Sequence, residues 1–406
     1  MNEDTNQCEN GKSFRINGNV LFAGAIILVI VTVFVTFLVA DRIYYNGALF
    51  RKSESVTFSG DNLDEYKVDK FQDLLRFIDE YYCLDYDVND VIEGAISGAV
   101  EALGDPYSTY LEPGSLDEYV DFITGTYIGA GFVYKDTDKG MEVLSVESGS
   151  PAEKAGILTG DVITFVNGKA VSEYSEADLD SLFAKEGNLI KIKAERADGT
   201  SVEAEVTIAR VSKQSVFVND YEGIMYIKIT QFDEDTGEEF LAAMKKIETL
   251  DCTGIILDLR DNGGGYEAQA DIVADRILPE GLIAYSENKK GERISEIKSD
   301  AECIDVPLVV LINENTASAS ELVAGAIRDH KKATLVGEKT YGKALGQTRR
   351  DYSEDGSGII LTIARYFTPS GECIHGVGIS PDIEIALTEG SEDDTQLQKA
   401  FEILKG

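Results

Sequence analysis

Two short segments hold residue types that could perform nucleophilic chemistry together. Residues 316–321 read Thr-Ala-Ser-Ala-Ser-Glu and lie between an apolar run at 307–313 and a helix-like run at 321–328. A serine at such a strand-to-helix turn lies near a helix N-terminus, where backbone N–H groups stabilise developing negative charge. A serine nucleophile needs a base, and the chain has only two histidines. The other candidate base is Lys343, which lies between small residues in the segment 341–347.

A lysine can act as this base only in an unusual environment. An unperturbed lysine has a pKa of about 10.4 and is normally a solvated surface charge. Burial of Lys343 among its small neighbours would lower that pKa toward the neutral range. Gln347, four residues later, lies on the same side of a helix or a strand and could orient the amine. The alternatives are that the serines of 316–321 are helix N-caps and that Lys343 and Gln347 are surface residues.

A glycine-rich turn at residues 258–265 could supply hydrogen-bond donors. It reads Asp-Leu-Arg-Asp-Asn-Gly-Gly-Gly and lies between an apolar run and a helical pattern. Glycines let the backbone approach a ligand closely, which suits an oxyanion hole. Two alternatives stay open: a flexible turn, or a dinucleotide-binding G-x-G-x-x-A motif at 263–268 with Glu287 contacting the ribose. Residues 260–262 separate the apolar run from the glycines, so the dinucleotide motif is poorly placed.

Composition and charge exclude several classes of partner. The 406 residues carry a formal net charge of −36, and almost all of that charge lies after residue 40. So acidic a chain should repel nucleic acids and anionic lipid surfaces, and solubility is the simplest interpretation. The five cysteines are widely spaced without a C-x-x-C motif, which disfavours a metal site. Buried free thiols are favoured over one or two long-range disulfides.

An apolar segment near the N-terminus predicts a membrane helix. Residues 20–40 contain no charged side chain over 21 positions, which is long enough to cross the core of a bilayer. We expect an uncleaved anchor, with a cleaved signal peptide as the alternative. The basic residues that flank this segment do not decide its orientation.

Hydrophobic periodicity predicts helical, β-rich and α/β regions in that order. Residues 68–103 carry apolar side chains at helical spacing, which predicts two or three helices. Residues 125–211 contain short alternating strands separated by glycine turns, with one helix at 177–183. From residue 223 onward strands alternate with helices, which indicates an α/β core. The strands are predicted at 224–229, 254–259, 306–312 and 359–364, and the helices at 237–250, 266–278, 318–328 and 394–404.

Taken together in chain order, these motifs resemble those of the carboxyl-terminal processing peptidases, a family of serine–lysine proteases. The resemblance covers about residues 68–404 and is specific because several motifs agree in sequence order. Besides the segments above, it rests on Leu-Gly-Asp-Pro-Tyr-Ser-Thr-Tyr-Leu at 103–111, Gly-Ser-Pro-Ala-Glu-Lys-Ala-Gly at 149–156, Gly-Asp-Val-Ile at 160–163, Val-Asn-Gly at 166–168, Gly-Glu-Lys-Thr-Tyr-Gly-Lys at 337–343 and Tyr-Phe-Thr-Pro-Ser-Gly at 366–371.

The resemblance implies roles for individual residues. It makes Ser318 the nucleophile, Lys343 the general base and Gln347 the residue that orients the lysine. It places the oxyanion donors in the Gly263–Gly264 turn and at Ala319. Residues at supporting positions are Arg260, Glu321, Asp329 and Thr340. The nucleophile and the base match the family pattern, so an inactive relative is not expected.

Residues 125–211 resemble a PDZ domain. The carboxylate-binding loop of that domain would consist of Tyr127, Ile128, Gly129, Ala130, Gly131 and Phe132. In such loops backbone N–H groups capture a terminal carboxylate while the peptide adds to the sheet as a strand. The alternative is a purely structural lid. We hypothesise that a bound substrate tail moves this domain and aligns Lys343 with Ser318.

The implied fold class is α/β: a crotonase-like α/β protease core with an inserted PDZ domain (β-rich, α+β) and an N-terminal helical segment, preceded by one transmembrane helix. The expected divisions are a short tail at 1–19, the transmembrane helix at 20–40, a stalk at 41–66, the helical region at 67–118, the PDZ domain at 119–213, the serine protease core at 214–390 and a C-terminal helix at 391–406.

The expected function is that of a membrane-anchored serine endopeptidase that cleaves protein substrates near their C-termini. The resemblance implies a catalytic part outside the cytoplasm and no cofactor, metal or nucleotide. The expected partners are protein or peptide substrates with free C-termini and the membrane, but no nucleic acid, and the tail near Phe401 could pair subunits in a homodimer. The alternative function is a non-catalytic PDZ adaptor that binds peptide tails at the membrane.

Overall fold

The computed structural model describes residues 65–387 and 393–406. The chain divides into two compact units, Met1–Tyr86 and Asp87–Gly406. The predicted N-terminal tail, the membrane helix at 20–40 and nearly all of the stalk lie outside the described residues. No helix within the described part is long and apolar enough to cross a membrane.

The predicted helices of the N-terminal region are present. Helix α2 spans Glu65–Tyr81 in the first unit, and α3 spans Val88–Glu101 in the second. The Asp87 carboxylate caps α3 by accepting from the Asn89 N–H at 2.8 Å. A third helix, α4 (Leu116–Thr124), follows strand β1 (Thr109–Leu111) and was not predicted.

The β-rich region is a five-stranded antiparallel sheet with a short sixth strand. Its strand order is β3-β4-β5-β7-β8, with β6 paired to β5. Its elements are β3 (Phe132–Thr137), β4 (Gly140–Val146), α5 (Pro151–Lys154), β5 (Val162–Val166), β6 (Lys169–Ala170), η1 (Val171–Glu173), α6 (Glu176–Phe183), β7 (Leu189–Glu195) and β8 (Ser201–Thr207). Flanking strands β2 (Thr126–Gly129) and β9 (Ala209–Ser212) pair as a separate antiparallel ribbon.

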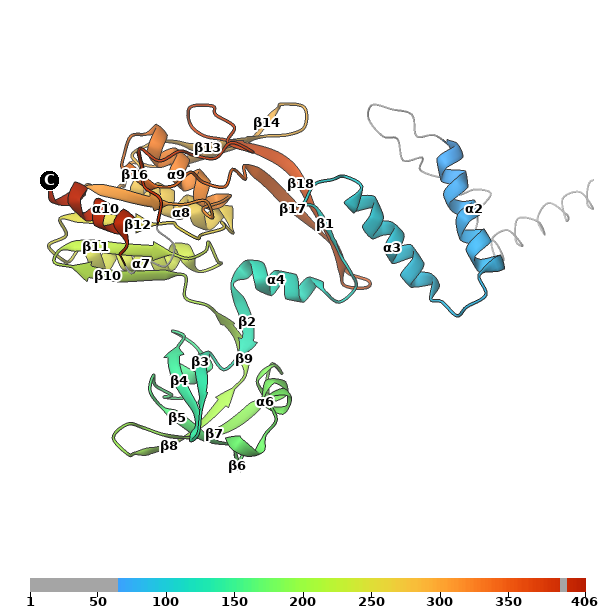
Figure 1. Ribbon diagram of the computed structural model, residues 1–406, viewed down its shortest axis with the longest axis horizontal. Helices are drawn as coiled ribbons and strands as arrows, with labels where there is room; N and C mark the ends of the chain where they lie inside the picture. Colours follow the sequence, from blue (N-terminus) through green and yellow to red (C-terminus); the bar gives the residue numbers. More distant parts are fainter. Residues whose placement is uncertain (1–64, 388–392) are drawn as a thin grey trace, which may run out of the picture. The chain divides into compact units, whose positions relative to one another are not determined.

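The α/β region is built on a second, mostly parallel sheet. Its strand order is β10-β11-β12-β15-β16-β19, and only the pair β10–β11 is antiparallel. Its elements, visible in yellow-green to red in Figure 1, are β10 (Val216–Tyr221), β11 (Ile224–Ile229), α7 (Thr236–Ile247), β12 (Gly254–Asp258), α8 (Glu267–Ile277), β15 (Leu308–Ile312), α9 (Ala319–Asp329), β16 (Thr334–Gly337), β19 (Ile383–Glu384) and α10 (Thr395–Lys405). Every strand and helix predicted here is present within a few residues.

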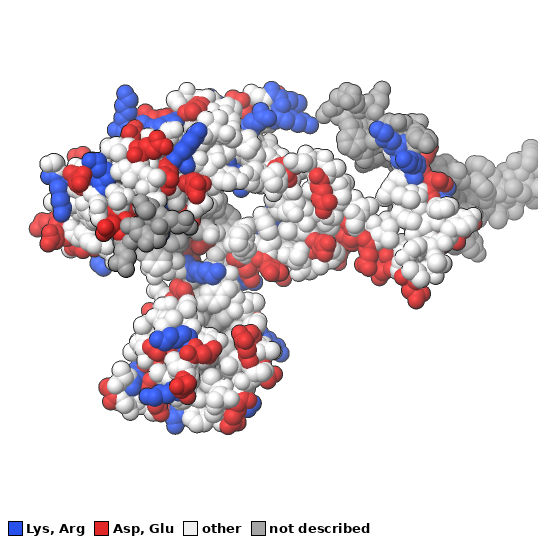
Figure 2. All heavy atoms as spheres, in the orientation of Figure 1, with Lys and Arg blue, Asp and Glu red and all other residues white. Residues whose placement is uncertain are grey.

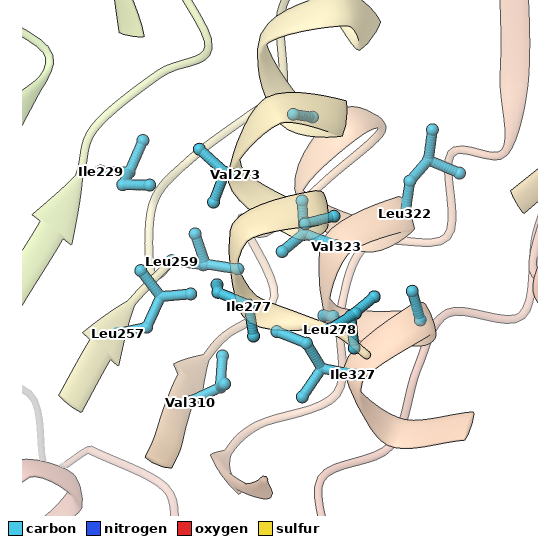
Figure 3. Packing of buried hydrophobic residues seen from close by; sticks show 14 of the residues in the cluster. Ile229, Leu257, Leu259, Val273, Ile277, Leu278, Val310, Leu322, Val323 and Ile327 are labelled. Carbon is cyan, nitrogen blue, oxygen red and sulfur yellow. The ribbon is translucent and has the colours of Figure 1, made fainter. Parts of the chain in front are cut away.

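The central strands of this sheet are buried on both faces. Alternate residues of a strand point to opposite faces, so Leu257 of β12 packs with α8 and α9, whereas Ile256 packs with α10. In Figure 3, Val323 of α9 and Val273 of α8 point toward the side chains of the strands. This packing holds α9 firmly against the sheet, and Ser318 lies at the N-terminus of that helix.

A third sheet is built from β1 and from strands that alternate along the chain with those of the α/β sheet. Its order is β1-β18-β13-β14, with β17 also paired to β18. The added elements are β13 (Gly281–Glu287), β14 (Arg293–Ser299), β17 (Leu345–Tyr352) and β18 (Ser357–Phe367). Strand β17 begins two residues after Lys343, so this sheet determines the direction of the segment that follows the lysine.

The described surface agrees with the acidic composition. Figure 2 shows acidic side chains spread over one face, with Lys and Arg scattered between them. The four cysteines of the described part are free thiols, as favoured, but the expectation of burial was wrong. Cys83 is exposed, and the other three are only partly buried.

Candidate active site

Ser318 occupies a strained turn between β15 and α9. Its backbone φ is 56° and its ψ is −119°, a left-handed φ that is uncommon outside glycine. Strained conformations of this kind gather at functional sites, and a serine on a tight strand-to-helix turn presents its Oγ outward. The half-buried side chain of Ser318 lines a cavity of about 490 Å³.

Buried hydrogen bonds hold this turn against the end of β12. The fully buried Thr316 hydroxyl donates to the Leu259 carbonyl at 2.8 Å and accepts from the Asn313 N–H at 3.0 Å. The Ala317 N–H donates to the Asn262 carbonyl at 3.0 Å. Thr316 therefore stabilises the turn that carries Ser318. These bonds fix that turn relative to the glycine turn.

The buried Glu321 carboxylate connects the serine segment to the lysine segment. Its Oε2 accepts from the N–H of Ser318 at 3.0 Å and from the N–H of Lys343 at 2.7 Å. Its Oε1 accepts from the Gly342 N–H at 2.8 Å and from the Thr340 hydroxyl at 2.5 Å. Glu321 and Thr340, expected at supporting positions, thus lie between the two predicted catalytic residues.

The Lys343 side chain lies in the same cavity as Ser318. Burial lowers the pKa of Lys343, although the nearby carboxylates of Asp105 and Glu321 oppose that shift. The Nζ atom lies 4.6 Å from the ring centroid of Tyr107. Among the described residues it makes no hydrogen bond, so the amine and the Ser318 hydroxyl share a cavity without being bonded to each other.

The glycine turn meets Ser318, but only part of it offers free donors. A Cβ at Gly264, where φ is 102°, would lie 2.7 Å from the Ser318 Cβ and 3.0 Å from the Ala319 nitrogen. The Gly264 N–H already donates to the Asn262 Oδ1 at 2.9 Å. In the described structure the N–H groups of Gly263 and Ala319 have no acceptor. Of the predicted oxyanion donors, only the N–H groups of Gly263 and Ala319 are therefore free. Gly264 instead allows the backbone of the glycine turn to lie close to Ser318.

Gln347 lines the cavity but does not contact the lysine by a hydrogen bond. Its Nε2 donates to the Leu345 carbonyl and the Thr362 hydroxyl, both at 3.3 Å. The pairing of β17 with β18 shifts register between Gly346 and Gln347. Such a bulge breaks the alternation of side chains along a strand. It explains why Gln347, expected on the same side as Lys343, makes no hydrogen bond to the amine.

Arg260 and Asp329 lie outside the cavity. The buried Arg260 guanidinium bonds to Asp258 at 2.6 Å and to Asp394 at 2.8 Å, which ties the end of β12 to α10. Asp329 accepts from the Ser370 N–H at 2.9 Å and so supports the segment 366–371. Both residues stabilise elements that carry the site, and neither lines the cavity.

Several cavity residues were missed by sequence reasoning. Tyr119, Phe122 and Ile123 of α4 line the cavity together with Glu267, whose carboxylate accepts from the Tyr366 hydroxyl. Apolar residues at helical spacing in 116–123 could have revealed this helix. The bond between Glu267 and Tyr366 joins positions 99 residues apart and leaves no local pattern.

The predicted carboxylate-binding loop, 127–132, spans the end of β2, the turn at Ala130 and Gly131, and the first residue of β3. Gly131 has a φ of 87°, and the N–H groups of Ala130 and Gly131 have no acceptor within the described residues. Strand β3 forms an edge of its sheet, and the Phe132 ring lies 5.7 Å from that of Phe183 in α6. Free N–H groups beside an open strand edge suit the capture of a peptide tail.

The dinucleotide alternative is wrong. Glu287 ends β13, which pairs antiparallel with β14 and β18 in a different sheet from β12. A dinucleotide site needs its acidic residue after a neighbouring parallel strand. The glycines of 263–265 instead line the cavity that holds Ser318.

Comparisons with known proteins agree with this geometry. Residues 223–385 match the model of peptidase family S41, 126–208 that of the PDZ domain, and 33–114 that of the activating protease CtpB N-terminal domain. The chain is 33% identical over 327 residues to the carboxy-terminal processing protease CtpA of Bacillus subtilis, which covers 80% of this chain and 70% of that protein. The chain belongs to the carboxy-terminal processing proteases.

Other members of this family support the same assignment. The carboxy-terminal-processing protease of Bartonella bacilliformis is 34% identical over 363 residues, covering 86% of this chain and 82% of that protein. The solved structure of a photosystem II D1 C-terminal processing protease has a TM-score of 0.50 at 28% identity, covering 85% of this chain and 92% of that one. This chain is therefore a serine protease with a PDZ domain, rather than a non-catalytic adaptor.

Proposed function

We propose that this protease cleaves protein substrates near their C-termini by a dyad of Ser318 and Lys343. The observation that carries the proposal is the single Glu321 oxygen that accepts from the backbone of both residues at the wall of one cavity. These two hydrogen bonds to Glu321 keep the side chains of Ser318 and Lys343 within the same cavity. Burial lowers the Lys343 pKa, as a neutral amine base requires.

The chemistry is acyl transfer in two steps. As the Ser318 Oγ attacks the scissile carbonyl, its proton passes to the Lys343 Nζ. The peptide C–N bond then breaks, and the leaving amine takes the proton from the Nζ. A water molecule next attacks the acyl-serine ester while Lys343 again accepts and returns a proton, which releases the new C-terminus and restores Ser318. Gln347 lies in the same cavity and orients the lysine once a substrate is bound.

The oxyanion is stabilised by two backbone donors. Ala319 contributes the first N–H of α9, where the helix dipole adds to the stabilisation. Gly263 contributes the second N–H, from the turn that Gly264 brings against Ser318. Fixed donors of this type stabilise the charge that develops in the transition state without having to reorganise.

The PDZ domain selects the substrate and controls the dyad. Its loop at 127–132 captures the free carboxylate, while the tail adds to the open edge of β3. Occupation of this site aligns Lys343 with Ser318. The proposed division places the PDZ domain at 119–213 and a crotonase-like core at 214–390.

Residues 20–40 anchor the enzyme in the cell membrane, with the catalytic part outside the cytoplasm. The apolar length of this segment supports a single span, and the acidic body suits an aqueous compartment rather than the lipid surface. Protease shaving of the full chain in membranes, from either side, tests both statements.

Cleavage of a fluorescent peptide by the full chain tests the central proposal. We expect Ser318→Ala to abolish cleavage and to retain binding of the peptide tail. Substrate with an amidated C-terminus should be cut more slowly than the free acid, because its end cannot fill the carboxylate loop. Cleavage by Ser318→Ala at the wild-type rate would refute the nucleophile, and equal rates for both substrates would refute tail selection.

A further inference from the structure

The loop before β1 contacts the predicted catalytic lysine through Tyr107. Asp105 accepts from the Tyr107 N–H at 3.0 Å and from the Ser108 hydroxyl at 2.6 Å. The Ser108 Oγ in turn accepts from the Thr362 N–H of β18 at 3.0 Å. These bonds hold the loop in a fixed shape against the sheet that follows Lys343.

The fixed loop presents an aromatic ring to the lysine. The Lys343 Nζ lies 4.6 Å from the centroid of the Tyr107 ring, within the range of a cation–π interaction. A hydrogen bond with Tyr341, together with burial, raises the pKa of Tyr107 to about 12. Tyr107 therefore stays neutral across the working pH range, and its hydroxyl is no competing base.

Burial lowers the pKa of Lys343, whereas the carboxylates and the ring that face the amine favour its charged form. Asp105 on the loop and Glu321 on α9 are the carboxylates that act on Lys343, and the Tyr107 ring attracts a cation as well. Glu267, which also lines the cavity, accepts a hydrogen bond from the Tyr366 hydroxyl. A base for Ser318 must instead be neutral.

We propose that Tyr107 is a positioning residue that holds the Lys343 ammonium away from Ser318 in the resting enzyme. The inference rests on the proposed dyad and adds to it a defined resting position for the base. When the amine turns toward Ser318, it leaves both the ring and Asp105. Its charged form then loses two sources of stabilisation, and the proton is released where a neutral amine is needed.

Covalent labelling of Ser318 by a fluorophosphonate, measured against pH, tests this proposal in the full chain. The rising limb of the labelling rate reports the loss of the lysine proton in the free enzyme. Tyr107→Leu should move this limb to lower pH by about 0.5–1.5 units, the size expected from removal of a cation–π contact. Tyr107→Phe keeps the ring and should superimpose on the wild type.

The proposal would be overturned if the rising limb of the labelling rate stays at the wild-type pH in Tyr107→Leu. It would also be overturned if the limb moves by the same amount in Tyr107→Phe. Tyr107→Met, of similar bulk but without a ring face, gives a second measurement if Tyr107→Leu does not fold, and the same shift is expected. Lys343→Met separates the two ideas. If Lys343→Met is labelled at the wild-type rate, the dyad itself is refuted. If Lys343→Met is not labelled but the rising limb of Tyr107→Leu stays at the wild-type pH, only the role of Tyr107 is refuted.

Discussion

The backbone N–H groups of Ser318 and Lys343 donate to the same atom, the Oε2 of Glu321, at 3.0 Å and 2.7 Å. The two segments are therefore joined through their main chains. The side chains are not joined, because the lysine amine lies over the ring of Tyr107. The proposed dyad therefore requires the lysine side chain to leave this ring and reach the Ser318 hydroxyl.

Glu321→Gln should impair both stability and catalysis. The carboxylate is fully buried and accepts four hydrogen bonds, and the amide would turn an NH₂ group toward N–H donors. Loss of such charge-assisted bonds costs roughly 2–3 kcal/mol. Urea unfolding and kcat measure the two effects. The control, Glu314→Gln, changes an exposed carboxylate in the preceding loop, and an equal effect of both variants would contradict the structure.

Two neighbouring glycines should differ sharply in their tolerance of alanine. At Gly264 a Cβ would lie 2.7 Å from the Ser318 Cβ, and φ is 102°, so Gly264→Ala must displace the serine or the turn. We expect kcat to fall by about 10²–10³, as when an oxyanion donor is lost. At Gly263 no atom lies within 4 Å of an added Cβ, and the N–H is retained. Gly263→Ala should keep most activity, and equal losses in the two variants would be inconsistent with this turn.

Asp233, which lies close to the start of the PDZ region, should make the stability of the folded protein depend on pH. Burial, which outweighs the opposing charge of Lys213, raises the pKa of this carboxyl to about 6, and its Oδ1 has no hydrogen-bond partner. A Cβ at Gly125, between α4 and β2, would meet this carboxyl group. The folded state therefore binds the proton more tightly than the unfolded state, and stability falls as pH rises from about 4 through about 6.

Asp233→Asn removes this penalty without removing much volume. It should raise the free energy of unfolding at pH 7.5 by about 1–2 kcal/mol and leave that at pH 4 nearly unchanged. Chemical denaturation at the two pH values measures the difference, with the exposed Glu234→Gln as the control. A gain of equal size at both pH values would show that ionisation of Asp233 is not the cause.

The regular elements of the α/β region could be predicted because their apolar periodicity is strong. Strands such as β12 and β15 are continuous apolar runs between polar turns, as expected of strands buried on both faces. Strand β17 was missed because most of its residues are exposed and polar, so neither a core nor an alternating pattern marks it. It is held in place by pairing with β18.

Some residues that line the cavity could be predicted from the sequence, but the contacts between them could not. Ser318 and Lys343 follow from residue type, spacing and resemblance, and both line one cavity. The contact of Tyr107 with Lys343 joins positions far apart in the chain, and no local signal records it. The Gly264 N–H is not a free donor because it donates to the side chain of Asn262. A glycine motif alone does not predict that hydrogen bond.

The most direct test of the account is single-turnover cleavage of a tail-bearing peptide by Lys343→Met. Methionine preserves the length and the apolar stem of the side chain but cannot accept a proton. The account predicts that the rate of bond cleavage falls by at least about 10³ while the peptide binds as tightly as to the wild type, because only the transition state loses the base. Cleavage by Lys343→Met at a rate near that of the wild type would contradict it.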